Sequence, residues 1–156
     1  MPKVALDRKV PDFTLPTTGA EGTWSLRAAA GQKLVVFFYP KDMTSGCTLE
    51  AQGFRDQAAA LRKAGTAIVG ISRDSLASHE KFCLKEKLPY PLLSDADEKV
   101  CRLFDVIQEK SLYGRKYMGI ERSTFLLDAA GILRREWRKV KVNGHVEEVL
   151  EAAKSL

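Results

Sequence analysis

Residues 33–39 (KLVVFFY) are the feature that most constrains the fold. They form an unbroken run of aliphatic, β-branched and aromatic side chains after Lys33, and Pro40 stops the run. This pattern is typical of a strand buried in the middle of a sheet. Residues 66–72 (TAIVGIS) show the same character. The two runs predict neighbouring buried strands of an α/β protein.

Helix signals follow each of these strands. Residues 48–65 have helical spacing, with Gly65 as the C-terminal stop. The apolar face predicted for this helix consists of Leu49, Phe54, Ala58 and Leu61. After the second strand, a helix is predicted to end near Lys87, and its N-cap oxygens are offered by Asp74, Ser75 and Ser78. The order strand, helix, strand, helix is therefore expected.

The remaining chain continues the same alternation. After residues 90–95 (YPLLSD), a helix is predicted over roughly 97–104, followed by strands near 123–128 and 132–137 with a tight turn at 128–131. A final helix is predicted from about His145. No linker, repeat or low-complexity segment interrupts the sequence. We expect one domain over residues 1–156, in which helices flank a central mixed β-sheet.

The net charge of +5 and the basic run Arg134, Arg135, Arg138, Lys139 and Lys141 raise the question of nucleic-acid binding. The run alternates with Trp137, Val140 and Val142, as in a strand with one face inward, and no aromatic stacking platform accompanies it. We therefore expect no nucleic-acid partner, although the basic surface suits an acidic protein partner. The sequence has no apolar stretch of about 20 residues and no secretory signal pattern at its start, which predicts a cytoplasmic protein without a membrane partner.

The three cysteines, Cys47, Cys83 and Cys101, are odd in number and widely spaced. This usage indicates reactive or buried thiols rather than a framework of disulfides. Only His79 and His145 accompany them, and no CxxC pair exists, so structural zinc and general disulfide-exchange chemistry are disfavoured. We expect no metal and no organic cofactor.

Cys47 is placed after a strand and in the first turn of a predicted helix, where unpaired backbone N–H groups converge. A free thiol with a pKa near 8.5 is only about 3% thiolate at pH 7, and a helix N-terminus alone stabilises the thiolate too little. A cation is needed, and Arg122 is the best candidate. A lower pKa of Cys47 by itself raises the rate of its reaction only slightly, because the nucleophilicity of a thiolate falls as its pKa falls. Thr44, Arg122 and loop N–H groups are therefore expected to stabilise the transition state.

Pro40, Thr44 and Cys47 match the PxxxTxxC signature of peroxiredoxins. With residues 113–128 (YGRKYMGIERSTFLLD) and 90–95 (YPLLSD), nearly the whole chain from Val10 resembles the peroxiredoxin Q family, also called bacterioferritin comigratory protein. The resemblance implies a thioredoxin-like fold. It also implies a peroxidase for antioxidant defence that reduces hydrogen peroxide or alkyl hydroperoxides, works as a monomer and is recycled by a thioredoxin-like protein.

The resemblance assigns a role to each matching residue. Cys47 is implied to be the peroxidatic cysteine, Thr44 to hydrogen-bond the peroxide, Pro40 to shield the site, and Arg122 to hold thiolate and substrate. Glu50 is implied to orient an arginine. Each residue also has a simpler alternative. Cys47 would be an inert buried thiol, Thr44 a helix cap and Pro40 the end of a strand. Arg122 would be a surface cation, and Glu50 a carboxylate favoured by the helix dipole.

The chain departs from many relatives at the resolving cysteine, whose usual place five residues after Cys47 is occupied by Gln52. A sulfenic acid over-oxidises unless a thiol condenses with it. One branch of the family carries its resolving cysteine on the later helix, which implies Cys83, whereas Cys101 has the pattern of core packing. We expect a disulfide between Cys47 and Cys83 to require local unwinding of their helices, because a disulfide demands close Cα atoms.

Three alternatives remain open from the sequence. In a one-cysteine enzyme, an external thiol would resolve Cys47 and Cys83 would be idle. In a redox sensor, oxidation would signal through a partner protein. Finally, His79, one turn before Cys83, would either aid proton transfer or be a satisfied or exposed helix histidine.

Overall fold

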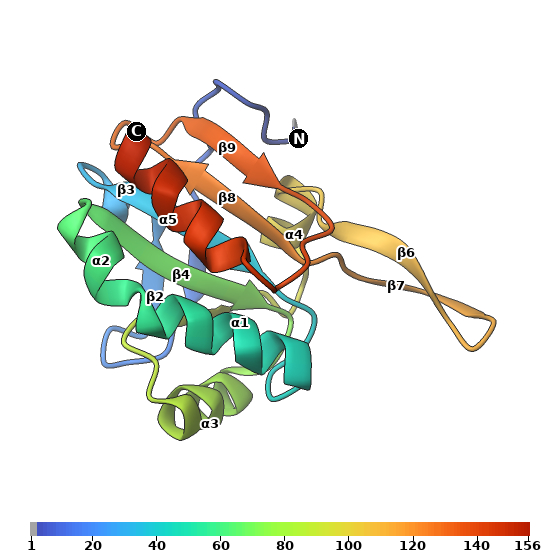
Figure 1. Ribbon diagram of the computed structural model, residues 1–156. Helices are drawn as coiled ribbons and strands as arrows, with labels where there is room; N and C mark the ends of the chain where they lie inside the picture. The colour runs from blue at the N-terminus through green and yellow to red at the C-terminus, as the bar shows by residue number, and fades with distance from the viewer. Residues whose placement is uncertain (1–2) are drawn as a thin grey trace.

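The computed structural model describes residues 3–156 and is built around a five-stranded sheet (Figure 1). The central strand β3 pairs in parallel with β4 on one side and antiparallel with β8 on the other, so the sheet is mixed, as expected. In spatial order the strands are β5 (Leu92–Ser94), β4 (Thr66–Ser72), β3 (Lys33–Phe38), β8 (Ser123–Leu127) and β9 (Leu133–Trp137).

Alternating side chains of β3 divide the core into two layers. Val35 and Phe37 pack with one apolar cluster, and Val36 and Phe38 pack with the other. The first layer lies beneath α1 (Ser45–Asp56), α2 (Ala58–Lys63), α3 (Leu76–Glu86) and α5 (His145–Ser155). The second lies beneath α4 (Lys99–Leu103), the short 3-10 helix η1 (Leu26–Ala29) and the N-terminal strands β1 (Thr14–Pro16) and β2 (Thr23–Ser25).

The helix predicted over residues 48–65 is divided in two. Gln57, with φ −102° and ψ 6°, separates α1 from α2, and this bend allows both Phe54 and Leu61 to be completely buried. Leu49 was wrongly assigned to the apolar face, because 60% of its side chain is exposed. The helical periodicity of the sequence continues through Gln57, whereas the bend at this residue follows from tertiary packing.

The basic run was also predicted to extend a strand through Val142, and this is wrong. Strand β9 ends at Trp137, and residues 138–144 form a loop before α5. Lys139 takes a left-handed conformation with φ 51°, and the Val140 N–H donates to the Arg122 carbonyl, so the ladder to β8 cannot continue.

The sequence did not predict the hairpin of β6 (Ile107–Leu112) and β7 (Arg115–Ile120), which projects away from the body of the molecule (Figure 1). Its two-residue turn, Tyr113 and Gly114, has positive φ angles of 51° and 78°. Such turns match the twist of paired strands. The hairpin leads directly through Glu121 into Arg122 and β8, and it therefore helps to fix the backbone position of Arg122.

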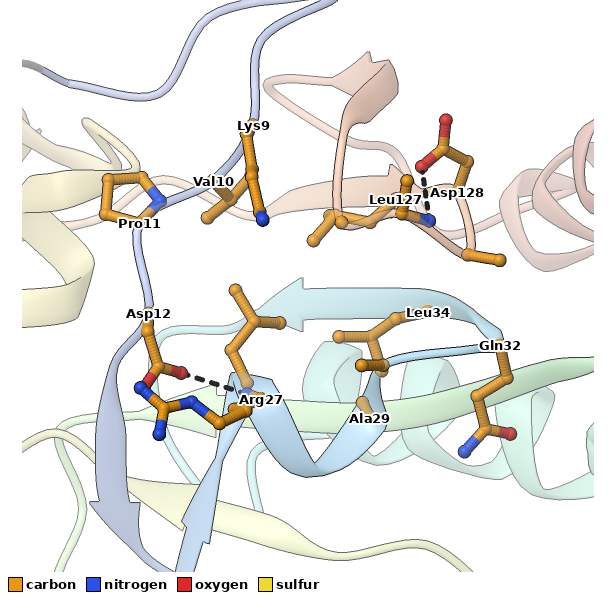
Figure 2. Close-up of a pocket in the computed structure, with 15 residues that line it drawn as sticks. Lys9, Val10, Pro11, Asp12, Arg27, Ala29, Gln32, Leu34, Leu127 and Asp128 are labelled. Carbon is orange, nitrogen blue, oxygen red and sulfur yellow. Dashed lines mark hydrogen bonds and ion pairs between the residues drawn. The ribbon is translucent and has the colours of Figure 1, made fainter.

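A pocket of about 490 Å³ opens beside the end of the sheet at which β3 begins and the antiparallel β8 ends (Figure 2). Leu34 and Leu127 line its apolar part, and the Arg27 backbone N–H donates to Asp12 at its rim. Cys47 follows the other end of β3, so this pocket is separate from the cysteine site. Among the described residues, no helix has the length and apolar character needed to cross a membrane.

Candidate active site

Cys47 is the third residue of α1 and lies just past the carboxyl end of β3. Thr44, in an extended conformation with φ −87° and ψ 157°, is the N-cap, and its carbonyl accepts a 2.8 Å hydrogen bond from the Thr48 N–H. Only 2% of the Cys47 residue is exposed, and it packs beside Ala51 and the Phe37 cluster. The thiol is therefore held in a nearly dry site at a helix N-terminus, where partial positive charge gathers.

Arg122 reaches this thiol from the residue preceding β8. Its Nη2 donates to the Cys47 Sγ at 3.2 Å. The approach depends on Gly46, because a Cβ at that position would lie 3.2 Å from the same Nη2 atom. The structure thus places the cation expected from the sequence directly on the sulfur.

Glu50, one turn after Cys47, orients the guanidinium from the other side. Its Oε1 lies 2.6 Å from Arg122 Nη1, and the glutamate is fully buried. Burial raises the pKa of Glu50 to about 7, although the Arg122 charge opposes the shift. Burial lowers the pKa of Arg122, but Glu50 and Cys47 together raise it above its ordinary value, so the guanidinium stays charged. Within residues 3–156, Glu50 Oε2 has no hydrogen-bond partner.

Pro40 and Thr44 belong to the loop between β3 and α1. Pro40 is half-buried next to the last residues of the strand, whereas Thr44 is exposed. The Thr44 hydroxyl donates to the Lys41 carbonyl at 2.9 Å, which fixes the turn before the helix. The loop therefore precedes the thiol in the chain, while Arg122 makes the polar contact with its sulfur and Glu50 holds Arg122.

Cys83 lies in α3 and shares an apolar cluster with Cys47, but the two thiols are not bonded. It is half-buried, and its Sγ donates to Thr18 Oγ1 at 3.7 Å. Burial raises the pKa of Cys83 above its ordinary value, and the Thr18 contact offsets only part of this. The thiol is therefore a weak nucleophile while α3 is folded.

Cys101 occupies α4 in the opposite core layer and has no exposed surface. Burial, followed by the charge of Asp95, raises its pKa strongly. An inaccessible, protonated thiol is chemically inert. The expectation that Cys101 packs in the core agrees with its position.

Lys110 and Asp42 are two site neighbours that sequence reasoning missed. Lys110 belongs to the unpredicted hairpin, and burial together with the Arg122 charge lowers its pKa, while the nearby Cys47 opposes the shift. Asp42 lies in the loop before α1 and is buried against His79, whose Nδ1 is 2.7 Å from its Oδ2. Lys110 has no local sequence signal because a distant element carries it to the site, and Asp42 has none because its partner His79 is 37 residues away.

Asp42, Asp74 and His79 are a group of possible metal ligands within residues 3–156, with ligand atoms within 4.8 Å of one another. Both ring nitrogens of His79 already contact oxygen atoms of the protein, and the Asp42 carboxylate accepts from Tyr39 and Ser78. The group is therefore a hydrogen-bond network, and a metal would have to displace most of it.

The mixed sheet, the cysteine in the first turn of α1 and the arginine on its sulfur define a thiol-reactive protein of the thioredoxin-like class. Comparisons with known proteins make the assignment specific. Residues 6–136 match the AhpC/TSA family. The chain is 49% identical to peroxiredoxin Bcp of Xanthomonas campestris over 99% of this chain and 98% of that protein. It is 45% identical to peroxiredoxin Bcp of Bacillus subtilis over 98% and 97% of the two chains.

Solved structures agree with the sequence relatives. A structure of Xanthomonas campestris peroxiredoxin Q superposes with a TM-score of 0.87 at 50% identity and covers 92% of this chain and 90% of that one. A further structure of that organism's bacterioferritin comigratory protein concerns its alkyl peroxide reduction activity. This chain belongs to the Bcp/peroxiredoxin Q family of peroxiredoxins, and it is a thiol-dependent peroxidase with the thioredoxin-like fold.

Proposed function

We propose that the enzyme reduces hydrogen peroxide and organic hydroperoxides for antioxidant defence through Cys47, with Cys83 as the resolving cysteine. The contact between Arg122 Nη2 and Cys47 Sγ at 3.2 Å is the observation that carries this proposal. It places a fixed cation where both the thiolate and the developing charge of a peroxide oxygen need one. Alkyl hydroperoxides are included because the Xanthomonas campestris relative is described by its alkyl peroxide reduction activity.

In the first step, the Cys47 thiolate attacks the terminal oxygen of the peroxide. An S–O bond forms, the O–O bond breaks, and the leaving oxygen takes a proton to become water or an alcohol. The product at Cys47 is a sulfenic acid. In this proposal Arg122 donates to the peroxide oxygens, and the Thr44 hydroxyl turns its hydrogen from the Lys41 carbonyl to the bound peroxide. Pro40 excludes water, and Glu50 keeps the guanidinium in place.

In the second step, the Cys83 thiol attacks the sulfenic sulfur, a disulfide forms, and water leaves. Cys47 and Cys83 are 36 residues apart, and the cysteines replaced by serine in two variants of the Xanthomonas campestris protein have the same separation. Unwinding α3 would both free Cys83 and remove the burial that raises its pKa. A thioredoxin-like dithiol then reduces the disulfide with two electrons.

Two cysteine variants test this proposal in a coupled assay with thioredoxin, thioredoxin reductase and NADPH. Cys47→Ser is expected to abolish peroxide consumption. Cys83→Ser is expected to retain one turnover of peroxide per enzyme but to lose thioredoxin-supported recycling. Full recycling by Cys83→Ser would assign the resolving step to an external thiol, and full activity of Cys47→Ser would reject the proposal as a whole.

We also propose that the enzyme works as a cytoplasmic monomer, as the family resemblance of the sequence implies. Sedimentation of the reduced and oxidised protein tests the oligomeric state, and a mass of two chains in either form would contradict it.

A further inference from the structure

One buried carboxylate ties the loop that precedes Cys47 to the helix that carries Cys83. Asp42 is 4% exposed, and its Oδ1 accepts from the Tyr39 hydroxyl at 2.6 Å. Its Oδ2 accepts from the Ser78 hydroxyl at 2.8 Å and contacts His79 Nδ1 at 2.7 Å. Ser78 and His79 form part of α3. Asp42 is thus shared by two elements that hold the two functional cysteines.

Both ring nitrogens of His79 are held by oxygen atoms. Its Nε2 lies 2.9 Å from the Leu93 carbonyl oxygen, which only accepts, so Nε2 carries a hydrogen. Its Nδ1 faces the Asp42 carboxylate at 2.7 Å. Burial raises the pKa of Asp42, but the contacts with His79, Tyr39 and Ser78 lower it below its ordinary value. The Asp42–His79 contact therefore joins a carboxylate to a ring that has no exposed surface.

The Asp42–His79 contact has further polar neighbours on each side. Asp74, two residues after β4, accepts through its Oδ2 from the Asp42 backbone N–H at 2.9 Å. Tyr39 directly follows β3, and its hydroxyl is 3.4 Å from His79 Nδ1 as well as bonded to Asp42. The network therefore joins the ends of β3 and β4, the loop before α1, and the first turns of α3.

The last turn of α3 is anchored separately, to α1. Gln52 Nε2 donates to Glu86 Oε1 at 2.8 Å, and Arg55 Nη1 donates to the Glu86 carbonyl at 2.9 Å. Cys83 lies between the two anchors. Opening of one anchor therefore lowers the free energy needed to unwind the helix around Cys83.

We propose that the Asp42–His79 hydrogen bond is a latch that keeps α3 folded until Cys47 is oxidised, and that it sets the rate at which Cys83 reaches the sulfenic acid. The inference rests on the proposed resolving role of Cys83. Asp42 precedes Cys47 by five residues, so unwinding of the first turn of α1 displaces the loop and pulls the carboxylate from His79. The latch thereby links events at one cysteine to release of the other.

A latch has a chemical consequence, because resolution competes with over-oxidation. A second peroxide converts the sulfenic acid to sulfinic acid irreversibly unless the disulfide forms first. A weaker latch raises the fraction of unwound α3 and favours the disulfide. Asp42, Ser78 and His79 are accordingly positioning residues for the second step, since they act through the helix and not on the peroxide.

The test measures the disulfide-forming rate after one equivalent of hydrogen peroxide, by quenched-flow mass spectrometry. Ser78→Ala removes one hydrogen bond to the charged carboxylate, which predicts about 10-fold faster disulfide formation and less sulfinic acid in excess peroxide. Its rate of peroxide reduction in the first step should equal that of wild type. The matched control is Lys81→Ala, an exposed change in the same helix, which should alter neither rate.

Asp42→Asn is a stronger variant with a readout that loss of stability alone does not produce. Hydrogen exchange of the α3 amides should increase in Asp42→Asn without oxidation, while that of the β3 amides stays at the wild-type level. Unchanged exchange of the α3 amides in Asp42→Asn, or an equal increase in both elements, would overturn the latch. If Asp42→Asn does not fold, the rate measured for Ser78→Ala decides the question.

The outcomes separate this inference from the proposed function. If wild type forms no disulfide between Cys47 and Cys83, the resolving role fails and the latch fails with it. If the disulfide forms but Ser78→Ala forms it at the wild-type rate, only the latch is refuted. Equal acceleration by Lys81→Ala would also refute it, because general weakening of α3 would then explain the effect.

Discussion

Replacing Glu50 by glutamine removes a buried carboxyl group whose ionisation works against the fold. The pKa of Glu50 is about 7 in the folded protein against an ordinary value of 4.5, because burial outweighs the attraction of Arg122. Between these two pH values the unfolded chain releases the proton while the folded protein retains it. The folded state therefore loses stability as the pH rises from about 4.5 to about 7, and the loss is constant above that range.

The size of this effect follows from the shift. At about 1.4 kcal/mol for each pKa unit, the wild-type protein loses about 3 kcal/mol over the interval. Glu50→Gln keeps an oxygen for Arg122 Nη1 and has nothing to ionise. Its free energy of unfolding should match that of wild type near pH 4.5 and exceed it by about 3 kcal/mol at pH 7.5.

The assay is urea unfolding of both proteins under reducing conditions at several pH values. The free energy of unfolding of Glu50→Gln is compared with that of wild type at each pH, because ionisation of His145 changes stability in the opposite direction. Burial lowers its pKa to about 4, so His145 favours the fold as the pH rises from about 4 to 6.5. That contribution is common to both proteins and cancels. Glu21→Gln, an exposed change, is the control, and a flat difference for Glu50→Gln would refute the reasoning.

Three further predictions concern the site and its support. Arg122→Met should slow the reaction of Cys47 with peroxide about 100-fold or more in stopped-flow fluorescence, with an unchanged circular dichroism spectrum; a rate near wild type would exclude the arginine from the first step. Gly46→Ala should lower the same rate less, because its Cβ would lie 3.2 Å from Arg122 Nη2, and an unaffected rate would show that the guanidinium adjusts freely. Phe54→Ala should cost about 3–5 kcal/mol in urea unfolding, since its fully buried ring stacks on Phe37 at 4.7 Å; a loss below 1 kcal/mol would contradict this packing.

Those parts of the fold that local pattern determines were predictable. The buried runs at 33–39 and 66–72 became β3 and β4, and Ser75 caps α3 by accepting from the Ser78 N–H, as expected. The turn at 128–131 joins β8 and β9, and α5 begins at His145. In each of these cases the hydrophobic pattern and the cap or turn residues favour the same structure.

The parts that were missed depend on distant contacts. The hairpin of β6 and β7 carries a polar, partly exposed sequence that shows no buried run, and its only local signal is the pair Tyr113 and Gly114. The division between α1 and α2 follows from packing, because helix propensity continues through Gln57. Hydrophobic periodicity reports burial on one face and is silent on such bends.

The residues of the site likewise divide into those that could be predicted from the sequence and those that could not. Because a thiolate needs a cation beside it, Arg122 could be predicted, and the structure places it 3.2 Å from the sulfur. The network of Asp42 and His79 was not found, because its members are 37 residues apart and neither belongs to a motif. His79 was expected to be satisfied or exposed, and it proves fully buried and bonded on both sides.

The central claim is that Cys47 reacts with peroxide and Cys83 resolves it, and an oxidation-state map of the three cysteines tests this most directly. The reduced enzyme receives one equivalent of hydrogen peroxide, free thiols are alkylated in denaturant, and peptides are identified by mass spectrometry. The account predicts a disulfide between Cys47 and Cys83 with Cys101 alkylated. A sulfenic or sulfinic acid on Cys47 with Cys83 alkylated, or a disulfide that includes Cys101, would contradict it.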